Sequence, residues 1–167
     1  MNYLMELEEL HLKLKAHLKN QNEKWEHFIY SKQDGFYQGL DKINIKGSRS
    51  TEKRFNEYNI GSLFSKNKNV LDIGSNCGFV SLYTSEFVKS VTGVEINPFL
   101  VKISNDTKEF LNIQNVKFVC STFEEYNTEE KFDIVYCCNI LLHLPDFRIP
   151  ITNLLNSTKK CCIIRTL

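Results

Sequence analysis

The stretch VLDIGSNCGF, residues 70–79, predicts a strand, a tight loop and the start of a helix. An apolar run typical of a buried strand comes first, a loop opened by Gly74 and closed by Gly78 follows, and Phe79 begins an apolar pattern with helical spacing. Glycine in such a loop lets a ligand approach the backbone, because no Cβ blocks it. The N–H groups at the start of the following helix can then bind the ligand. The stretch therefore predicts a ligand-binding turn between a strand and a helix.

The same alternation of strand and helix patterns continues to the end of the chain. We expect strands at residues 70–73, 91–95, 116–120, 132–138 and 161–165, and helices between them at residues 79–89, 97–112 and 149–156. Asn97 and Pro98 suit a helix start, with an N-cap side chain followed by proline at the first helical position. Strands that alternate with helices form βαβ units. The expected fold is α/β, with a doubly wound, mostly parallel sheet of about five strands.

A different pattern precedes this core, so we divide the chain into an N-terminal helical or lid segment, residues 1–60, and a core, residues 61–167. Leucines spaced three and four residues apart give residues 1–31 one apolar helical face. That helix is expected to pack on the domain, with a lid or a dimer contact as the alternatives. Residues 32–50 are expected to form an irregular connection.

A short helix is expected from about Thr51 to Asn59. Ser50 or Thr51 can cap its start, because either hydroxyl can accept a hydrogen bond from the first turn.

Composition limits the classes of function. The 21 basic and 20 acidic side chains leave a net charge of +1, so no global field marks a nucleic-acid binder. A local basic stretch over residues 40–70, with seven basic residues against three acids, keeps RNA open as a partner. None of the six cysteines forms a CxxC pair, so we expect no metal site and a reducing, cytoplasmic location. No apolar run approaches the roughly 20 residues that cross a membrane.

Two common phosphate-binding loops do not fit the glycine spacing. A dinucleotide loop, G-x-G-x-x-G counted from Gly74, needs glycine at positions 76 and 79, where this chain has Asn76 and Phe79. A P-loop needs a Gly-Lys-Ser/Thr ending, and the sequence has none.

The loop instead resembles the first motif of the class I, Rossmann-like, S-adenosylmethionine (SAM)-dependent methyltransferases, an acid followed by G-x-G-x-G. Asn76 stands at the middle glycine, and asparagine tolerates the positive φ expected there. The resemblance implies SAM as the cofactor, with Asp72, Gly74 and Gly78 beside its methionine part. Ser75 and Asn76, in the same loop, are included among the cofactor-binding residues.

The next two elements agree with that family. Glu95 ends the second strand, where an acid can accept hydrogen bonds from both ribose hydroxyls, a geometry shared with NAD sites. The resemblance implies Glu95 as the ribose ligand and Ile96 and Asn97 beside the adenine. Many family members have an acid after the third strand that holds the adenine amino group. This chain offers other cofactor-binding candidates there, Ser121, Thr122 and Phe123.

The segment FDIVYCCNILLHLPD, residues 132–146, closely resembles the family's fourth element. The resemblance implies that Asn139 and Ile140 line the crevice where the methyl donor meets the substrate. His143 is a candidate general base for a hydroxyl or amine, and a packing or helix-capping role is the alternative.

Residues 34–55 also look like the segment that precedes the SAM loop in some bacterial methyltransferases, where it helps to close the pocket. Arg49 or Arg54 is expected to pair with the SAM carboxylate, because a guanidinium fork fits a carboxylate.

The resemblance covers residues 65–167 and implies methyl transfer from SAM to a small molecule, a sugar or RNA, with no membrane involved. The family's last two strands are missing, so we expect a core truncated after its fifth strand. That strand would then be an exposed edge. The alternatives are that the sequence is a fragment, or that a partner, a second copy or the N-terminal helices cover this edge. Two other functions stay open: a non-catalytic SAM-binding or partner-binding module, and an NAD-dependent oxidoreductase.

Overall fold

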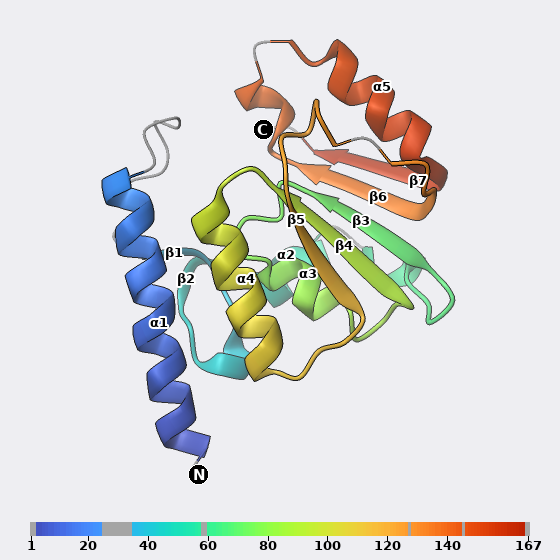
Figure 1. Ribbon diagram of the computed structural model, residues 1–167. Coiled ribbons are helices and arrows are strands. Elements are labelled where there is room, and N and C mark those ends of the chain that lie inside the picture. Colours follow the sequence, from blue (N-terminus) through green and yellow to red (C-terminus); the bar gives the residue numbers. More distant parts are fainter. Residues whose placement is uncertain (1–2, 25–34, 58–59, 127, 145, 166–167) are drawn as a thin grey trace.

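A computed structural model describes residues 3–24, 35–57, 60–126, 128–144 and 146–165 of the chain (Figure 1). Its centre is a parallel sheet with the strand order β5-β4-β3-β6-β7. The strands are β3 (Asn69–Ile73), β4 (Ser90–Glu95), β5 (Val116–Cys120), β6 (Phe132–Cys138) and β7 (Thr158–Arg165). The chain runs outward from β3 through β4 to β5, then returns to the other side of β3 for β6 and β7. The predicted five-stranded, doubly wound parallel sheet is confirmed.

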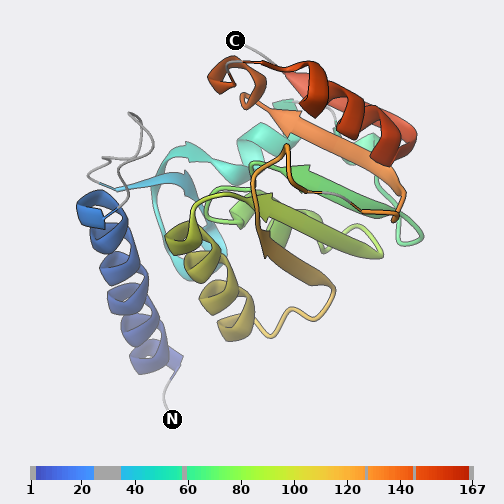
Figure 2. The same ribbon diagram turned by 45° about the horizontal axis from the view of Figure 1, so that its top comes forward.

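Helices cover both faces of this sheet (Figure 2). One face carries α3 (Phe79–Thr84) and α4 (Pro98–Phe110), and the other carries α5 (Arg148–Ser157). Each face has its own apolar core, one containing Ile103 of α4 and the other Leu154 of α5. A central parallel strand is therefore buried on both sides, which explains the continuous apolar runs in the sequence.

Two predicted helix starts are confirmed. The side chain of Asn97 accepts a hydrogen bond from the N–H of Phe99 at 2.9 Å, and α4 begins at the proline between them. The Ser50 hydroxyl accepts a hydrogen bond from the N–H of Lys53 at 3.3 Å, at the start of α2 (Thr51–Glu57).

Two predicted boundaries differ from the structure. The helix expected over residues 79–89 ends at Thr84, because the chain turns at Ser85, whose hydroxyl donates to the Leu82 carbonyl at 2.6 Å. The apolar spacing beyond that point reflects a turn in which Val88 is buried while Phe87 is exposed. The strand expected from Cys161 begins three residues earlier, directly after α5.

The N-terminal helix α1 (Tyr3–Lys24) lies beside α4 (Figure 1). It falls inside the range predicted for a helix, and the rest of that range, which contains Trp25, Phe28 and Ile29, lies outside the described residues. Its predicted apolar face is buried, through Leu7, Leu10, Leu14 and Leu18. No helix among the described residues has the length and apolar character needed to cross a membrane.

Ion pairs and hydrogen bonds join α1 to the rest of the molecule. Asp106 of α4 contacts Lys13 Nζ and His17 Nε2 of α1, each at 2.8 Å. His11 Nε2 lies 2.6 Å from the carbonyl oxygen of Ile43. Polar contacts thus flank the leucine face and fix the position of the helix.

The irregular connection predicted over residues 32–50 is wrong. The described part of it forms β1 (Phe36–Gly39) and β2 (Gly47–Ser50), a parallel pair joined through the 3₁₀ helix η1 (Asp41–Ile43). A Cβ added at Gly47 would lie 2.1 Å from the carbonyl carbon of Gln38, so only glycine allows the two backbones to approach this closely. Strands this short, without apolar alternation, leave no periodic pattern in the sequence.

Candidate functional site

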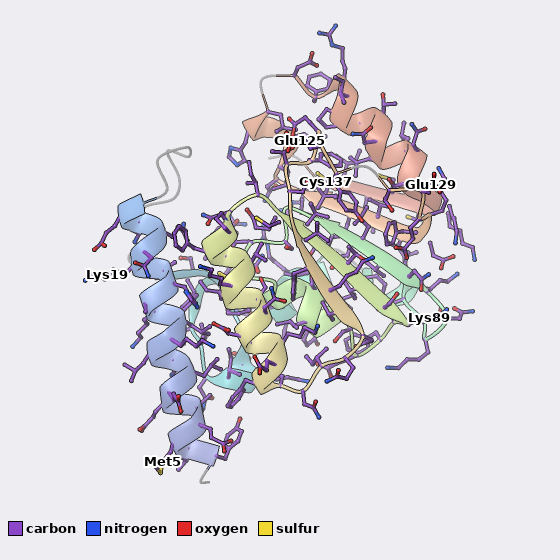
Figure 3. All side chains as sticks on the ribbon, in the orientation of Figure 1. Met5, Lys19, Lys89, Glu125, Glu129 and Cys137 are labelled. Carbon is purple, nitrogen blue, oxygen red and sulfur yellow. The ribbon has the colours of Figure 1, made fainter. Side chains whose placement is uncertain are left out.

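A cavity of about 520 Å³ lies at the carboxyl ends of β3, β4, β5 and β6. The strand order reverses at β3, and in open α/β sheets the crevice at such a switch point is the usual ligand site. Figure 3 marks the two ends of the sheet: Glu125 follows the carboxyl end of β5, and Lys89 precedes the amino end of β4. The cavity is at the Glu125 end.

Most of the residues that the sequence suggested line this one cavity. They are Arg54, Asp72, Gly74, Asn76, Glu95, Ile96, Asn97, Ser121, Thr122, Phe123, Asn139, Ile140 and His143. Ser75 and Gly78 do not belong to its lining. Segments far apart in the sequence therefore converge on one volume.

The glycine loop has the backbone conformation that its sequence predicted. Gly74 has φ of +72° and Asn76 has φ of +53°, which confirms that asparagine replaces glycine at a left-handed position. The N–H groups of Gly74 and Ser75 both donate to the carbonyl oxygen of Val94, at 2.8 and 3.0 Å. A Cβ on Gly74 would lie 2.1 Å from Cδ1 of Ile140, so the loop is in close contact with the segment that follows β6.

Gly78 and Ser75 belong to the loop but lie outside the cavity lining. Gly78 has φ of +72°, and a Cβ there would lie 2.5 Å from Ser104 Oγ and 2.6 Å from Phe118 Cζ. The Ser75 side chain is buried, and its hydroxyl has no hydrogen-bond partner within the described part of the chain. Gly78 therefore allows close packing of the loop on α4 and β5.

Glu95 is held in place by two backbone N–H groups. Its Oε2 accepts a hydrogen bond from Asn76 and its Oε1 accepts one from Asn97, both at 2.9 Å. Burial raises the pKa of this carboxyl, and the N–H groups of Asn97, Asn76 and Ile96 oppose that rise. Each oxygen has a further lone pair, so the carboxylate can accept two more hydrogen bonds from neighbouring hydroxyls.

Asp72 lies in the buried part of β3. Its Oδ2 accepts a hydrogen bond from the Ser81 hydroxyl at 2.5 Å. Burial is the main cause that raises the pKa of Asp72 to about 7; the Ser81 bond and the Arg54 charge lower it, and Glu95 raises it. The carboxyl can therefore gain or lose a proton near neutral pH.

Three residues after β5 form another part of the lining. Phe123 is buried, while Ser121 and Thr122 are partly exposed. The Ser121 hydroxyl donates to the Thr122 carbonyl at 3.0 Å, which leaves its oxygen able to accept a hydrogen bond. The Thr122 hydroxyl accepts from the N–H of Glu125 at 3.0 Å, which leaves its proton able to donate. The pair thus offers one acceptor and one donor to a ligand.

The segment after β6 lines the cavity from the side of β7. Asn139 has φ of +60°, and its N–H donates to the carbonyl oxygen of Arg165 at 2.8 Å. Both polar atoms of its side-chain amide are buried without a partner among the described residues. His143 is exposed and ends the 3₁₀ helix η3 (Leu141–His143). Cys138 also lines the cavity, and burial raises its pKa to about 11, so its thiol stays protonated.

Sequence reasoning expected residues 34–55 to help close the pocket but named only Arg49 and Arg54 there, and it missed other lining residues of the N-terminal segment. Tyr37 and Gln38 of β1, and Leu18 and Gln21 of α1, all line the cavity. The apolar stripe of α1 could have indicated Leu18. No signal in the sequence indicated Gln38, because the strand that carries it is so short.

Of the two arginines considered as anion ligands, the structure favours Arg54. Arg54 is buried in the cavity lining, whereas Arg49 is exposed. No group of three histidine, cysteine or acidic residues that could hold a metal occurs among the described residues.

Comparisons with known proteins agree with this geometry. A family model described as a methyltransferase domain matches residues 64–166. An uncharacterized RNA methyltransferase of Mycoplasma mobile is 41% identical over 81 residues, which are 47% of this chain and 22% of that protein. A ubiquinone biosynthesis O-methyltransferase of Coxiella burnetii is 30% identical over 82 residues, which are 48% of this chain and 35% of that protein. The matching segment is therefore about a third or less of each of these two relatives.

A solved structure shares the fold. Magnesium protoporphyrin IX methyltransferase of Synechocystis, solved with bound SAM, superposes with a TM-score of 0.57 at 19% identity, over 68% of this chain and 55% of that one.

Proposed function

The chain belongs to the family of methyltransferase domains, and from this membership we propose that it transfers a methyl group from SAM to a nucleophile. One observation carries the proposal. Glu95, with both oxygens already fixed by backbone N–H groups, lies in the same cavity as the glycine loop and Arg54. That combination fits a ligand with a sugar diol at one point and an amino-acid group at another.

The residues present fit the cofactor. The cavity volume falls within the range of about 300–1,000 Å³ that is usual for ligand pockets. Polar atoms of Arg54, Asn76 and Asn139 are buried without a partner in the described residues, and leaving such a group unpaired costs about 1–3 kcal/mol. A polar ligand that satisfies them would recover part of that cost.

We assign the binding roles by the chemistry of each group. Glu95 accepts hydrogen bonds from the ribose hydroxyls, and Arg54 pairs with the carboxylate of the methionine part. Ser121 accepts a hydrogen bond from the adenine amino group, because its own proton is already donated to a backbone carbonyl. Asp72 and the Gly74 loop border the methionine part. When bound, SAM supplies an electrophilic methyl group on a sulfonium.

For the chemical step we propose that His143 acts as general base. It is exposed in the cavity lining, where an incoming hydroxyl or amine could reach it. The expected result for His143→Gln is a fall in kcat of about 10²-fold or more with an unchanged dissociation constant for S-adenosylhomocysteine. An unchanged kcat would remove His143 from the reaction.

We also propose the class of acceptor, a role for the N-terminal segment, a partner at the edge of the sheet and a location. The acceptor is a small molecule, a sugar or RNA, and residues 1–60 serve as a lid segment over the core. The outer edge of β7 has no neighbouring strand among the described residues, which supports a partner or a second copy there. The six cysteines are unpaired thiols, which supports a reducing, cytoplasmic location.

Calorimetry with SAM, S-adenosylhomocysteine and NAD tests the cofactor. We expect both adenosyl compounds to bind and NAD to bind weakly or not at all. Tight binding of NAD alone would overturn the proposal in favour of an oxidoreductase. Transfer of a labelled methyl group to a panel of small molecules, sugars and RNA then tests turnover, and binding without transfer to any of them would favour a non-catalytic SAM-binding module.

A further inference from the structure

One wall of the cavity is built by three polar residues of the N-terminal segment. Tyr37 and Gln38 lie on β1, and Arg54 lies on α2. Arg54 Nη2 donates a hydrogen bond to the Tyr37 hydroxyl at 3.2 Å, and Arg54 Cζ lies 5.2 Å from the centroid of the Tyr37 ring. Tyrosine therefore holds the guanidinium through both its hydroxyl and its ring.

The elements that carry these residues are fixed to each other. The close approach of β1 and β2 at Gly39 and Gly47 leaves no room for a side chain. The Thr51 hydroxyl, at the start of α2, donates to the carbonyl oxygen of Gly39 at 2.5 Å, and Thr51 is buried. The end of β1 and the start of α2 are thereby joined, so the position of Gln38 relative to Arg54 is set before any ligand binds.

The charges at this end of the cavity are complementary to a zwitterion. Arg54 is close enough to Asp72 for its charge to lower the pKa of that carboxyl against the effect of burial. Nε of Arg54 and Oε1 of Gln38 are buried, and neither has a partner among the described residues. The wall thus offers an unpaired donor on a cation, and an amide oxygen and a carboxyl as acceptors.

We propose that Tyr37, Gln38 and Arg54 form, together with Asp72, a clamp for an α-amino acid group. Arg54 binds the carboxylate of that group, while Gln38 Oε1 and Asp72 accept hydrogen bonds from its ammonium. Tyr37 is a positioning residue, since it acts through Arg54. The inference rests on the proposed function, because the group is the methionine part of SAM.

Two adenosine compounds isolate the clamp from the rest of the site. S-adenosylhomocysteine carries the amino-acid group, and 5′-methylthioadenosine lacks it. For Tyr37→Phe and for Gln38→Met, calorimetry should give a dissociation constant for S-adenosylhomocysteine about tenfold higher than the parent value, as expected for one lost hydrogen bond. The dissociation constant for 5′-methylthioadenosine should stay within about twofold.

Arg49→Gln is the matched control. Arg49 Cζ also lies over the Tyr37 ring, at 5.7 Å, but Arg49 is exposed and does not line the cavity. We expect it to change the affinity for neither compound.

The outcomes separate the clamp from the function on which it rests. If the parent chain binds S-adenosylhomocysteine and the two variants leave its affinity unchanged, the clamp is overturned and the proposed function stands. An equal loss for both compounds would assign Tyr37 and Gln38 a purely structural role and would also overturn the clamp. If the parent binds neither compound, the proposed function itself fails.

Discussion

The glycine loop after β3 and the β1–β2 pair line the same cavity but reach it by different means. The loop is part of a βαβ unit, in which an apolar strand, a glycine turn, a helix and a second apolar strand follow one another. The β1–β2 pair has four-residue strands, and two glycines set its geometry by close backbone contact. One region is specified by a repeating pattern and the other by a single close packing contact.

This difference shows where the two halves of the site should be sensitive to change. The loop uses positive φ and direct contact with Ile140, so a side chain there affects the cavity itself. The β1–β2 pair contributes Tyr37 and Gln38 to the cavity, and its two glycines act indirectly, by fixing the strand that carries those residues. Substitutions in the core should therefore affect binding or folding as a whole, whereas those in the N-terminal segment should affect one part of the ligand or one helix.

The largest expected effect is that of Gly74→Val. A side chain at this positive φ would lie within 2.1 Å of Ile140, so we expect the affinity for S-adenosylhomocysteine to fall by at least about 100-fold while the sheet stays folded. Calorimetry measures the affinity, and far-UV circular dichroism shows whether the sheet is folded. Gly35→Val is the control, because a Cβ there meets nothing within 4 Å. Retained affinity would show that the loop is not a contact surface.

Asp72→Asn should change how stability depends on pH. Burial raises the pKa of Asp72 to about 7, above its value in the unfolded chain, so the folded state holds a proton that the unfolded state releases. The associated stability is fully present below about pH 4 and is lost as pH rises through about 7. At pH 8 the variant should exceed the parent in unfolding free energy by on the order of 3 kcal/mol, and near pH 4 the two should be similar.

Urea unfolding between pH 4 and pH 8 measures this difference. Asp133→Asn is a control of opposite sign: the N–H of Asn69 lowers the pKa of Asp133, so this variant should lose stability at neutral pH. Parallel pH curves for the parent and Asp72→Asn would show that Asp72 has no raised pKa.

Glu95→Ala should weaken binding of S-adenosylhomocysteine by on the order of 1–3 kcal/mol, because a charged hydrogen-bond acceptor is lost. The N–H groups of Asn76 and Asn97 also lose their partner, so the loop is less well fixed. Glu109→Ala, on the exposed side of α4, should leave the affinity as it is. An unchanged dissociation constant in Glu95→Ala would remove this residue from the site.

The smallest effect is expected for Asp106→Asn, which breaks the ion pairs with Lys13 and His17. The pairs are partly exposed, so the loss should be about 1 kcal/mol or less. Amide hydrogen exchange should rise in α1 and stay constant in β3 and β4. Glu23→Gln, which removes an exposed pair within α1, is the control. Faster exchange across the whole sheet would contradict the view that the N-terminal helix docks as a separate element.

The sequence allowed the core to be predicted because each of its elements is marked locally. The apolar strand runs, the cap at Asn97 and the positive φ at Asn76 all follow from residue chemistry. The site candidates followed from the resemblance to the methyltransferase family, whose motifs stand at the strand ends. Tyr37 and Gln38 could not be predicted in the same way. Their place depends on a contact between Gly39 and Gly47, and sequence spacing does not indicate which glycines touch. The early end of α3 was missed because its turn continues the apolar spacing of the helix.

The hydrogen bond from the N–H of Asn139 to the carbonyl oxygen of Arg165 joins the cavity lining to the last described residue of the edge strand. A strand that adds to the outer side of β7 would restrain Arg165, and through it the backbone from which the Asn139 amide projects. The rate per chain would then depend on how much of the protein is assembled through β7. Because assembly increases with protein concentration, the specific rate would change with concentration.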